Sequence, residues 1–182
     1  SSLHVLFPPK SEATAWQNAG LMLRQGVQFH WENADYADFD AMLAAMAHDK
    51  RKRIKQDRRY VAEAGVTWRV ARGAVISESD WAFFYRCYDT TYRAHMSTPY
   101  LSLDFFQQLG ANCADAAVLF VGERDGQALC TSLCVASGDT VYGRYWGTLA
   151  PLKSLHFEAC YYQPISWCIA NGFTRFEGGA QG

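Results

Sequence analysis

The sequence lacks any long apolar segment. No stretch approaches the roughly 20 consecutive apolar residues that a helix needs to cross a bilayer. Nor do the first residues show the charged, apolar and small-residue succession of a secretory signal. We therefore predict that the chain has no membrane span and is cytoplasmic.

An excess of charge of either sign is also absent. Seventeen Lys and Arg residues stand against 18 Asp and Glu residues, which leaves a formal charge of -1. Such a balance argues against DNA as a partner, against a general nucleic-acid coat and against a membrane-surface protein. With 49% hydrophobic residues over 182 positions, the chain can bury a core as one compact unit or slightly more.

Cysteine is too sparse to build a disulfide scaffold. The six cysteines include no CxxC pair. Cys130 and Cys134 would share one face of a strand, and His156 and Cys160 would share one face of a helix. Each pair offers two ligands, whereas a structural zinc ion takes four. We therefore predict no metal site.

The pattern of apolar residues and turn residues predicts a mixed sheet with flanking helices. Asp125-Gly126 and the Ser137–Asp139 segment favour hairpins. The strands on either side of these turns should therefore be antiparallel neighbours. A helix that crosses back from the last of them makes the final strand parallel to it. The fold class is α/β or α+β, with expected strands at residues 3–7, 26–31, 66–70, 117–123, 129–136, 141–146 and 174–177, and expected helices at 11–21, 34–65, from 77 or 79 onward, 103–109 and 155–171.

The expected helix over residues 34–65 carries a dense basic segment. Seven of the ten residues 50–59 are Lys or Arg, and Asp57 is the only acidic residue among them. At 100° per residue one side of this helix gathers what we call the basic stripe: Arg51, Lys55, Arg58 and Arg59. The stripe is either a solvated face, a site for a polyanion such as a diphosphate or an RNA backbone, or a dock for an acidic protein.

Polar and aromatic side chains crowd the junctions of the last strand, helix and strand. This composition suits a cleft that holds a polar substrate. Structural roles compete with this interpretation, because Glu177 can pair with Arg144 or Arg175, His156 can be a hydrogen-bonded scaffold residue, and Trp146 can belong to the core. The residues concerned are Tyr142, Arg144, Tyr145, Trp146, His156, Glu158, Tyr161, Gln163, Glu177 and Gln181.

Several of these segments resemble one known family. The basic residues 50–54, followed by Gly65-Val66, are similar to the basic helix and Gly-Val strand that join the two halves of Fem-type aminoacyltransferases, which add amino acids to peptidoglycan precursors. The order of the downstream elements is also similar. A narrower resemblance, to the Fem-like family of peptidoglycan biosynthesis or recognition, is carried by Gln28–Asn33, Tyr142–Gly147, His156–Gln163 and Glu177–Gly182.

The resemblance implies two halves with the GNAT-like N-acyltransferase fold. Residues 1–33 would be the tail of a first half, residues 34–66 a long basic connecting helix, and residues 67–182 most of a second half, with the chain truncated at both ends. True acetyltransferases hold the coenzyme A diphosphate in a Gly-rich turn at a helix start. Residues 148–154 contain no glycine. Aminoacyl-tRNA is therefore favoured as acyl donor over a coenzyme A thioester.

The implied chemistry is amide formation on an amine of a peptidoglycan-precursor-like molecule. Glu177 is the preferred base, because the helix macrodipole should keep Glu158 ionised and weakly basic. Glu158 and Tyr161 are the other catalytic candidates. The expected substrate-binding residues are His30, Tyr142, Arg144, Tyr145, Trp146, His156, Gln163 and Gln181. The alternative function is a recognition module that binds a peptidoglycan or tRNA-like ligand without turnover.

Overall fold

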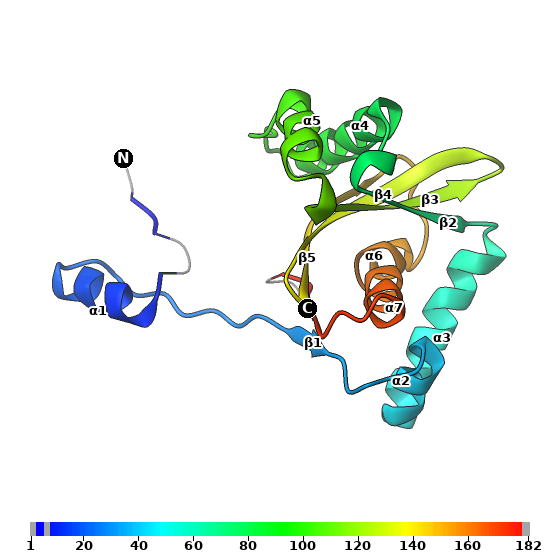
Figure 1. The fold of residues 1–182 in the computed structure, drawn as a ribbon, viewed down its shortest axis with the longest axis horizontal. Coiled ribbons are helices and arrows are strands. Elements are labelled where there is room, and N and C mark those ends of the chain that lie inside the picture. Colours follow the sequence, from blue (N-terminus) through cyan, green and yellow to red (C-terminus); the bar gives the residue numbers. More distant parts are fainter. Residues whose placement is uncertain (1–2, 6–7, 180–182) are drawn as a thin grey trace.

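The computed structural model describes residues 3–5 and 8–179 and contains one six-stranded sheet (Figure 1). The strand order is β1-β6-β5-β4-β3-β2. All neighbouring strands are antiparallel except β5 and β6, which are parallel. The strands are β1 (His30–Glu32), β2 (Thr67–Arg72), β3 (Ala117–Arg124), β4 (Gln127–Ser137), β5 (Thr140–Thr148) and β6 (Arg175–Glu177).

The predicted mixed sheet is confirmed, with its hairpins and its final parallel strand. Asp125 and Gly126 both have positive φ angles, as a two-residue hairpin turn of the favoured twist requires. The segments preceding the basic helix fit less well. Leu3–Val5 form no strand, Leu6 and Phe7 lie outside the described residues, and the expected strand at 26–31 is reduced to β1.

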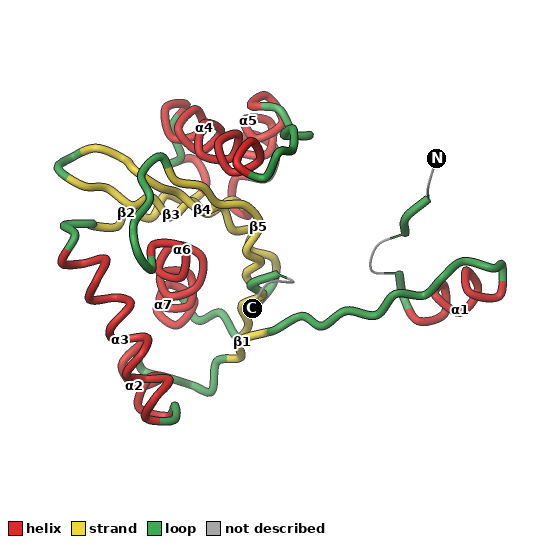
Figure 2. Tube along the Cα trace, turned by 180° about the vertical axis from the view of Figure 1, so that it is seen from behind, coloured by secondary structure: helices red, strands yellow, loops and turns green. Residues whose placement is uncertain are grey.

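Helices cover both faces of the sheet (Figure 2). On one face α4 (Glu78–Ala94) and α5 (Leu103–Asn112) pack on a core that contains Leu119 and Leu133. A capping box formed by Ser77 and Asp80 starts α4. On the other face α2 and α7 pack on Val118 and its neighbours. The remaining elements are α1 (Lys10–Asn18), α2 (Phe39–Ala45), α3 (His48–Glu63), the 3-10 turns η1 (Gly73–Val75) and η2 (Ala114–Ala116), α6 (Leu155–Phe157), the π-turn η3 (Glu158–Tyr162) and α7 (Gln163–Ala170).

The basic helix is shorter than predicted. Instead of one helix over residues 34–65, the chain forms α2 and α3, separated by extended backbone at Met46 and Ala47. Asp38 caps α2 and accepts a hydrogen bond from the Ala41 backbone. The break lets α2 bury its apolar face against α7, while α3, whose only fully buried side chain is Val61, crosses toward β2. Packing has overridden local helix propensity here.

The helix predicted over residues 155–171 is continuous but contains a π-turn. The irregularity lies just before Pro164, at η3. Pro164 has no N–H to donate to the Cys160 carbonyl, and its ring would clash with that carbonyl in a regular helix. The backbone N–H of Gln163 instead donates to the Glu158 carbonyl, five residues earlier. One turn is therefore widened.

Candidate functional site on the open face of the sheet

The parallel pair β5 and β6 gathers several predicted site residues on one face. Glu177 on β6 lies opposite both Tyr142 on β5 and His30 on β1. Side chains directly opposite each other in neighbouring strands share a face. The adjacent pair, Phe176 and Val141, points into the core beneath α7. Tyr142, Glu177 and His30 therefore lie on the opposite face, and together with Arg144 we call them the open-face row.

The members of this row contact one another. His30 Nδ1 lies 3.4 Å from Glu177 Oε1, and the two side chains are 39% and 23% exposed. The Arg144 guanidinium lies over the Tyr142 ring, 5.3 Å from its centroid. Arg144 is the additional residue in a β-bulge, since Tyr145 pairs with Leu133 and Gly143 with the next residue of β4. A bulge re-aims the side chain that it carries.

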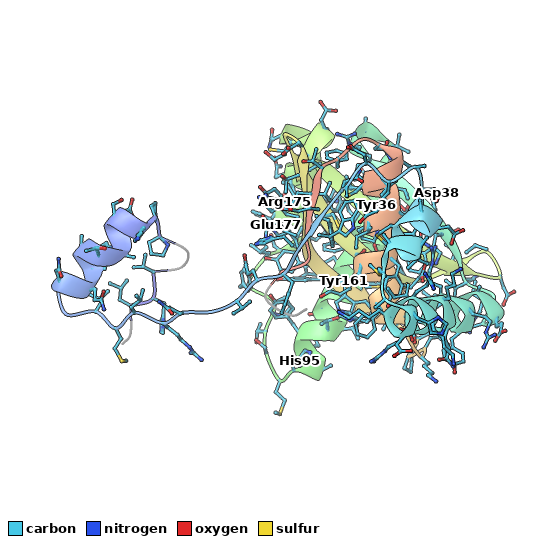
Figure 3. All side chains as sticks on the ribbon, turned by 90° about the horizontal axis from the view of Figure 1, so that it is seen from below. Tyr36, Asp38, His95, Tyr161, Arg175 and Glu177 are labelled. Carbon is cyan, nitrogen blue, oxygen red and sulfur yellow. The ribbon has the colours of Figure 1, made fainter. Side chains whose placement is uncertain are left out.

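The row remains accessible because α4 and α5 do not extend over it. The core beneath these helices includes residues of β2, β3, β4 and β5, and within the described chain its buried members include none of β6 or β1. Figure 3 shows Arg175 and Glu177 close together on β6. Arg175 is held by Glu32 on β1 at 3.1 Å. The alternative in which Glu177 pairs with Arg175 is therefore not observed. Glu177 contacts His30, and Arg175 contacts Glu32.

Tyr145 points into the α4 and α5 core instead of the row. Its ring lies 5.1 Å from that of Tyr88 and 5.9 Å from that of Phe106. Its hydroxyl lies 2.6 Å from the Tyr100 hydroxyl. Burial and this hydrogen bond raise the pKa of Tyr145. Tyr145 therefore supports the scaffold next to Arg144 as a neutral phenol.

Trp146, His156 and Tyr161 form an aromatic group on the other face of the sheet. The His156 ring lies 4.7 Å from the Trp146 ring and 5.9 Å from the Tyr161 ring. Burial lowers the pKa of His156. A Cβ atom at Gly178 would approach Tyr161 Cε1 to 2.6 Å, so the glycine allows the strand to pass close to this ring. The group is separated from the open-face row by the sheet.

Glu158 is the only Asp or Glu side chain that is fully buried within the described residues. It is 2% exposed, and burial raises its pKa. Desolvation therefore acts on Glu158 in the opposite direction to the helix macrodipole, and the nearby Arg58 guanidinium partly compensates by favouring the ionised form. Its Oε1 accepts from Arg58 Nε at 3.2 Å and from Gln163 Nε2 at 2.7 Å. Glu158 thus lies on the α7 side of the sheet, and the sheet separates it from Arg144 and Glu177 in the open-face row.

The basic stripe divides into residues with and without internal partners. Arg58 is bound to Glu158 and lies over the Phe39 ring at 4.5 Å. Arg51 donates to the Ala44 carbonyl, and Arg59 lies 3.6 Å from Glu63. Lys55 makes no ion pair or hydrogen bond within the described chain. A cavity of about 390 Å³, which we call the α3 pocket, is lined by Lys55, Arg58, Arg59, Val61, Ala62, Val66, Trp68, Glu158 and Gln163.

Asp57 and Ser154, which the sequence analysis did not select as site residues, connect α3 to the start of α6. Ser154 Oγ donates to Asp57 Oδ1 at 2.7 Å, and the Tyr162 hydroxyl donates to Asp57 Oδ2 at 3.3 Å. Ser154 has a φ angle of 63°, which is uncommon for a residue other than glycine. The sequence signal for Asp57 was its isolation among seven cations. Gln181, another predicted site residue, lies outside the described residues.

Comparison with known proteins agrees with this architecture. The fold is a GNAT-like mixed α/β fold. The C-terminal domain (DUF2156) of a putative lysylphosphatidylglycerol synthetase from Agrobacterium fabrum matches with a TM-score of 0.60 and 11% identity, covering 92% of this chain and 51% of that chain. L-PGS from Bacillus licheniformis matches with the same score and identity, covering 92% and 49%. This chain thus spans about half the length of these structures.

The family model matches the entire chain. The FemAB-like family, described as peptidoglycan biosynthesis/recognition, matches residues 1–182, so the chain belongs to this family. The resemblance noted in the sequence is confirmed. A sequence search of curated proteins finds no match. Within the described residues, no helix is both long and apolar enough to cross a membrane.

Proposed function

We propose that this protein is an N-acyltransferase that forms an amide bond on an amine of a peptidoglycan-precursor-like molecule. The observation that carries the proposal is the open-face row, in which a carboxylate lies between a histidine and a tyrosine on three adjacent strands, with Arg144 alongside. Ligands of α/β sheets commonly bind beyond the ends of parallel strands. The family's description supports the class of acceptor.

In the proposed reaction the neutral substrate amine attacks the acyl carbonyl carbon, and Glu177 accepts a proton from its nitrogen as the C–N bond forms. The tetrahedral intermediate then collapses, and the C–O bond to the leaving group breaks. The Tyr142 hydroxyl donates a proton to the leaving oxygen and regains one from solvent. Arg144 binds a carboxylate or phosphate of the substrate through paired N–H groups. His30 holds the Glu177 carboxylate in position.

Tyr161 and Glu158 were also catalytic candidates from the sequence. Because both lie on the face of the sheet that α7 covers, away from the open-face row, the geometry favours Tyr142 and Glu177 for proton transfer. By holding the amine nitrogen close to the acyl carbon, the row would supply much of the rate increase in such a transfer.

An ester of tRNA is the proposed acyl donor. A coenzyme A diphosphate would be expected at the turn between β5 and α6, where helix N–H groups favour anions. In this chain the Asp57 carboxylate approaches that turn through Ser154. The Ser154 hydroxyl is thereby already used as a donor, and residues 148–154 contain no glycine that would let a diphosphate approach the backbone. This arrangement supports aminoacyl-tRNA over a coenzyme A thioester.

The test is transfer from radiolabelled aminoacyl-tRNA or acetyl-coenzyme A to a muropeptide precursor. Glu177→Gln keeps the side-chain shape and removes the base, so we expect about a hundredfold lower turnover with precursor binding retained. Glu32→Gln, on the same face of neighbouring β1, is the matched control and should stay near wild type. Wild-type turnover in the Glu177 variant would exclude that residue as the base. Binding of precursor without transfer by the wild-type protein would favour the recognition module.

A further inference from the structure

The α3 pocket is a second site, distinct from the open-face row. It lies between α3, β2 and the π-turn, on the face of the sheet that α7 covers. Its volume of about 390 Å³ falls in the range of small-molecule sites. Neither the family description nor the proposed transfer reaction accounts for a ligand at this place.

One part of the pocket is cationic and available. Lys55 is exposed and has no ion-pair partner within the described chain. Arg59 has only Glu63 in reach among the described residues, at 3.6 Å, and both side chains are about two-thirds exposed. Such a surface pair is weak. These two cations can therefore take a carboxylate from a ligand at little cost.

The other part of the pocket contains an acceptor without a donor. Glu158 Oε2 is buried and has no hydrogen-bond partner among the described atoms, while Oε1 is bound by Arg58 and Gln163. Buried polar atoms in folded proteins are rarely left unpaired. A small group with N–H donors, such as a primary ammonium, would supply the missing bond. A purely anionic ligand would leave Oε2 unpaired and face its charge.

Part of the lining of the pocket is apolar. Val61, Val66 and Trp68 line the cavity, and Val61 is 1% exposed. An RNA backbone carries neither an ammonium nor an aliphatic group, so it does not match this combination. A molecule with an ammonium, a carboxylate and an apolar side chain on one carbon matches all three parts.

We propose that the α3 pocket binds a free apolar α-amino acid, with its ammonium at Glu158, its carboxylate at Lys55 and Arg59, and its side chain against Val61, Val66 and Trp68. This site does not depend on the proposed transfer reaction. Loss of transfer activity therefore leaves it unaffected, and its own test requires binding alone.

The test is calorimetric titration of the wild-type protein with L-leucine, N-acetyl-L-leucine and L-leucinamide. The first keeps both charged groups, the second lacks the ammonium, and the third lacks the carboxylate. We expect saturable binding of L-leucine and at least tenfold weaker binding of each derivative. Fluorescence of Trp68, isolated by comparison with Trp68→Phe, should change with the same midpoint.

Variants locate the site on α3. Lys55→Gln with Arg59→Gln should weaken L-leucine binding at least tenfold. Lys52→Gln with Arg53→Gln removes the same charge from the same helix on residues that line a different groove, and should change it less than twofold. Absence of saturable L-leucine binding to the wild type, equal binding of the three compounds, or equal losses in the two double variants would each overturn the proposal.

Discussion

Removal of Arg58 should destabilise the protein in a pH-dependent way. The side chain of Glu158 is 3% exposed and that of Arg58 is 32% exposed. Breaking a buried ion pair by removing one partner costs about 3–5 kcal/mol, because the remaining charge is uncompensated. Since Arg58 is about one-third exposed, water screens part of this term. We therefore expect Arg58→Ala to lower the free energy of unfolding by about 2–3 kcal/mol near neutral pH.

The pH dependence follows from the raised pKa of Glu158. Because burial raises this pKa above that of an ordinary glutamate, the folded state binds the proton more tightly than the unfolded chain. The stability linked to Glu158 is thus fully present below the unfolded pKa and is lost as pH rises through the folded pKa. Arg58 offsets that loss only where Glu158 is ionised. At low pH its removal should cost about 1 kcal/mol, from one hydrogen bond and the contact with Phe39.

Urea denaturation at low and neutral pH measures both values. At neutral pH the expected loss corresponds to a fall in melting temperature of roughly 4–12 °C for a chain of this size. In a Glu158→Gln background the cost of Arg58→Ala should become the same at both pH values. Lys52→Ala, an exposed cation on the same helix, should change stability by less than about 0.5 kcal/mol. A cost of Arg58→Ala that is independent of pH in the otherwise wild-type protein would refute this reasoning.

Three further predictions concern the scaffold. A Cβ atom at Gly147 would overlap the backbone of α4, so Gly147→Ala should lower the free energy of unfolding by at least about 2 kcal/mol in thermal melts. Gly26→Ala, in open space, is the control and should be neutral, and equal effects of the two variants would contradict the packing. Exposed Cys113 should react quickly with a thiol reagent, and Cys130, whose pKa burial raises to about 12, only after unfolding; rapid reaction of both would be inconsistent with the core. Ser77→Ala should lower the free energy of unfolding by about 1 kcal/mol, because it removes the cap of α4, and an unchanged melting temperature would contradict this role.

The elements that could be predicted from sequence are those set by local signals. The hairpins around Asp125-Gly126 and Ser137–Asp139 were readable because positive φ angles select glycine and its neighbours. The break at Met46 and Ala47 could not be predicted from the sequence, because neither residue is a helix breaker and the cause lies in the packing of α2. Local propensity describes turns well and describes long-range packing poorly.

The candidate site was predictable in its residues and not in its arrangement. His30 and Glu177 were selected separately, and their contact depends on an antiparallel pairing of strands about 150 residues apart that no turn specifies. The environment of Glu158 was missed for a similar reason. Its position near a helix start suggested an ionised carboxylate, whereas burial by α3, a helix about 100 residues earlier, raises its pKa.

The π-turn explains how two predicted residues come to share one partner. In a regular α-helix, residues five positions apart differ by about 140° around the axis, so Glu158 and Gln163 would point to different sides. In a π-turn the fifth residue closes the turn, and its side chain lies nearly above that of the first. This alignment allows Gln163 Nε2 to donate to Glu158 Oε1 at 2.7 Å. Because Oε1 is then shared by Gln163 and Arg58, Oε2 is the oxygen left for a ligand. The proline that widens this helix thus also prepares the carboxyl group of the α3 pocket.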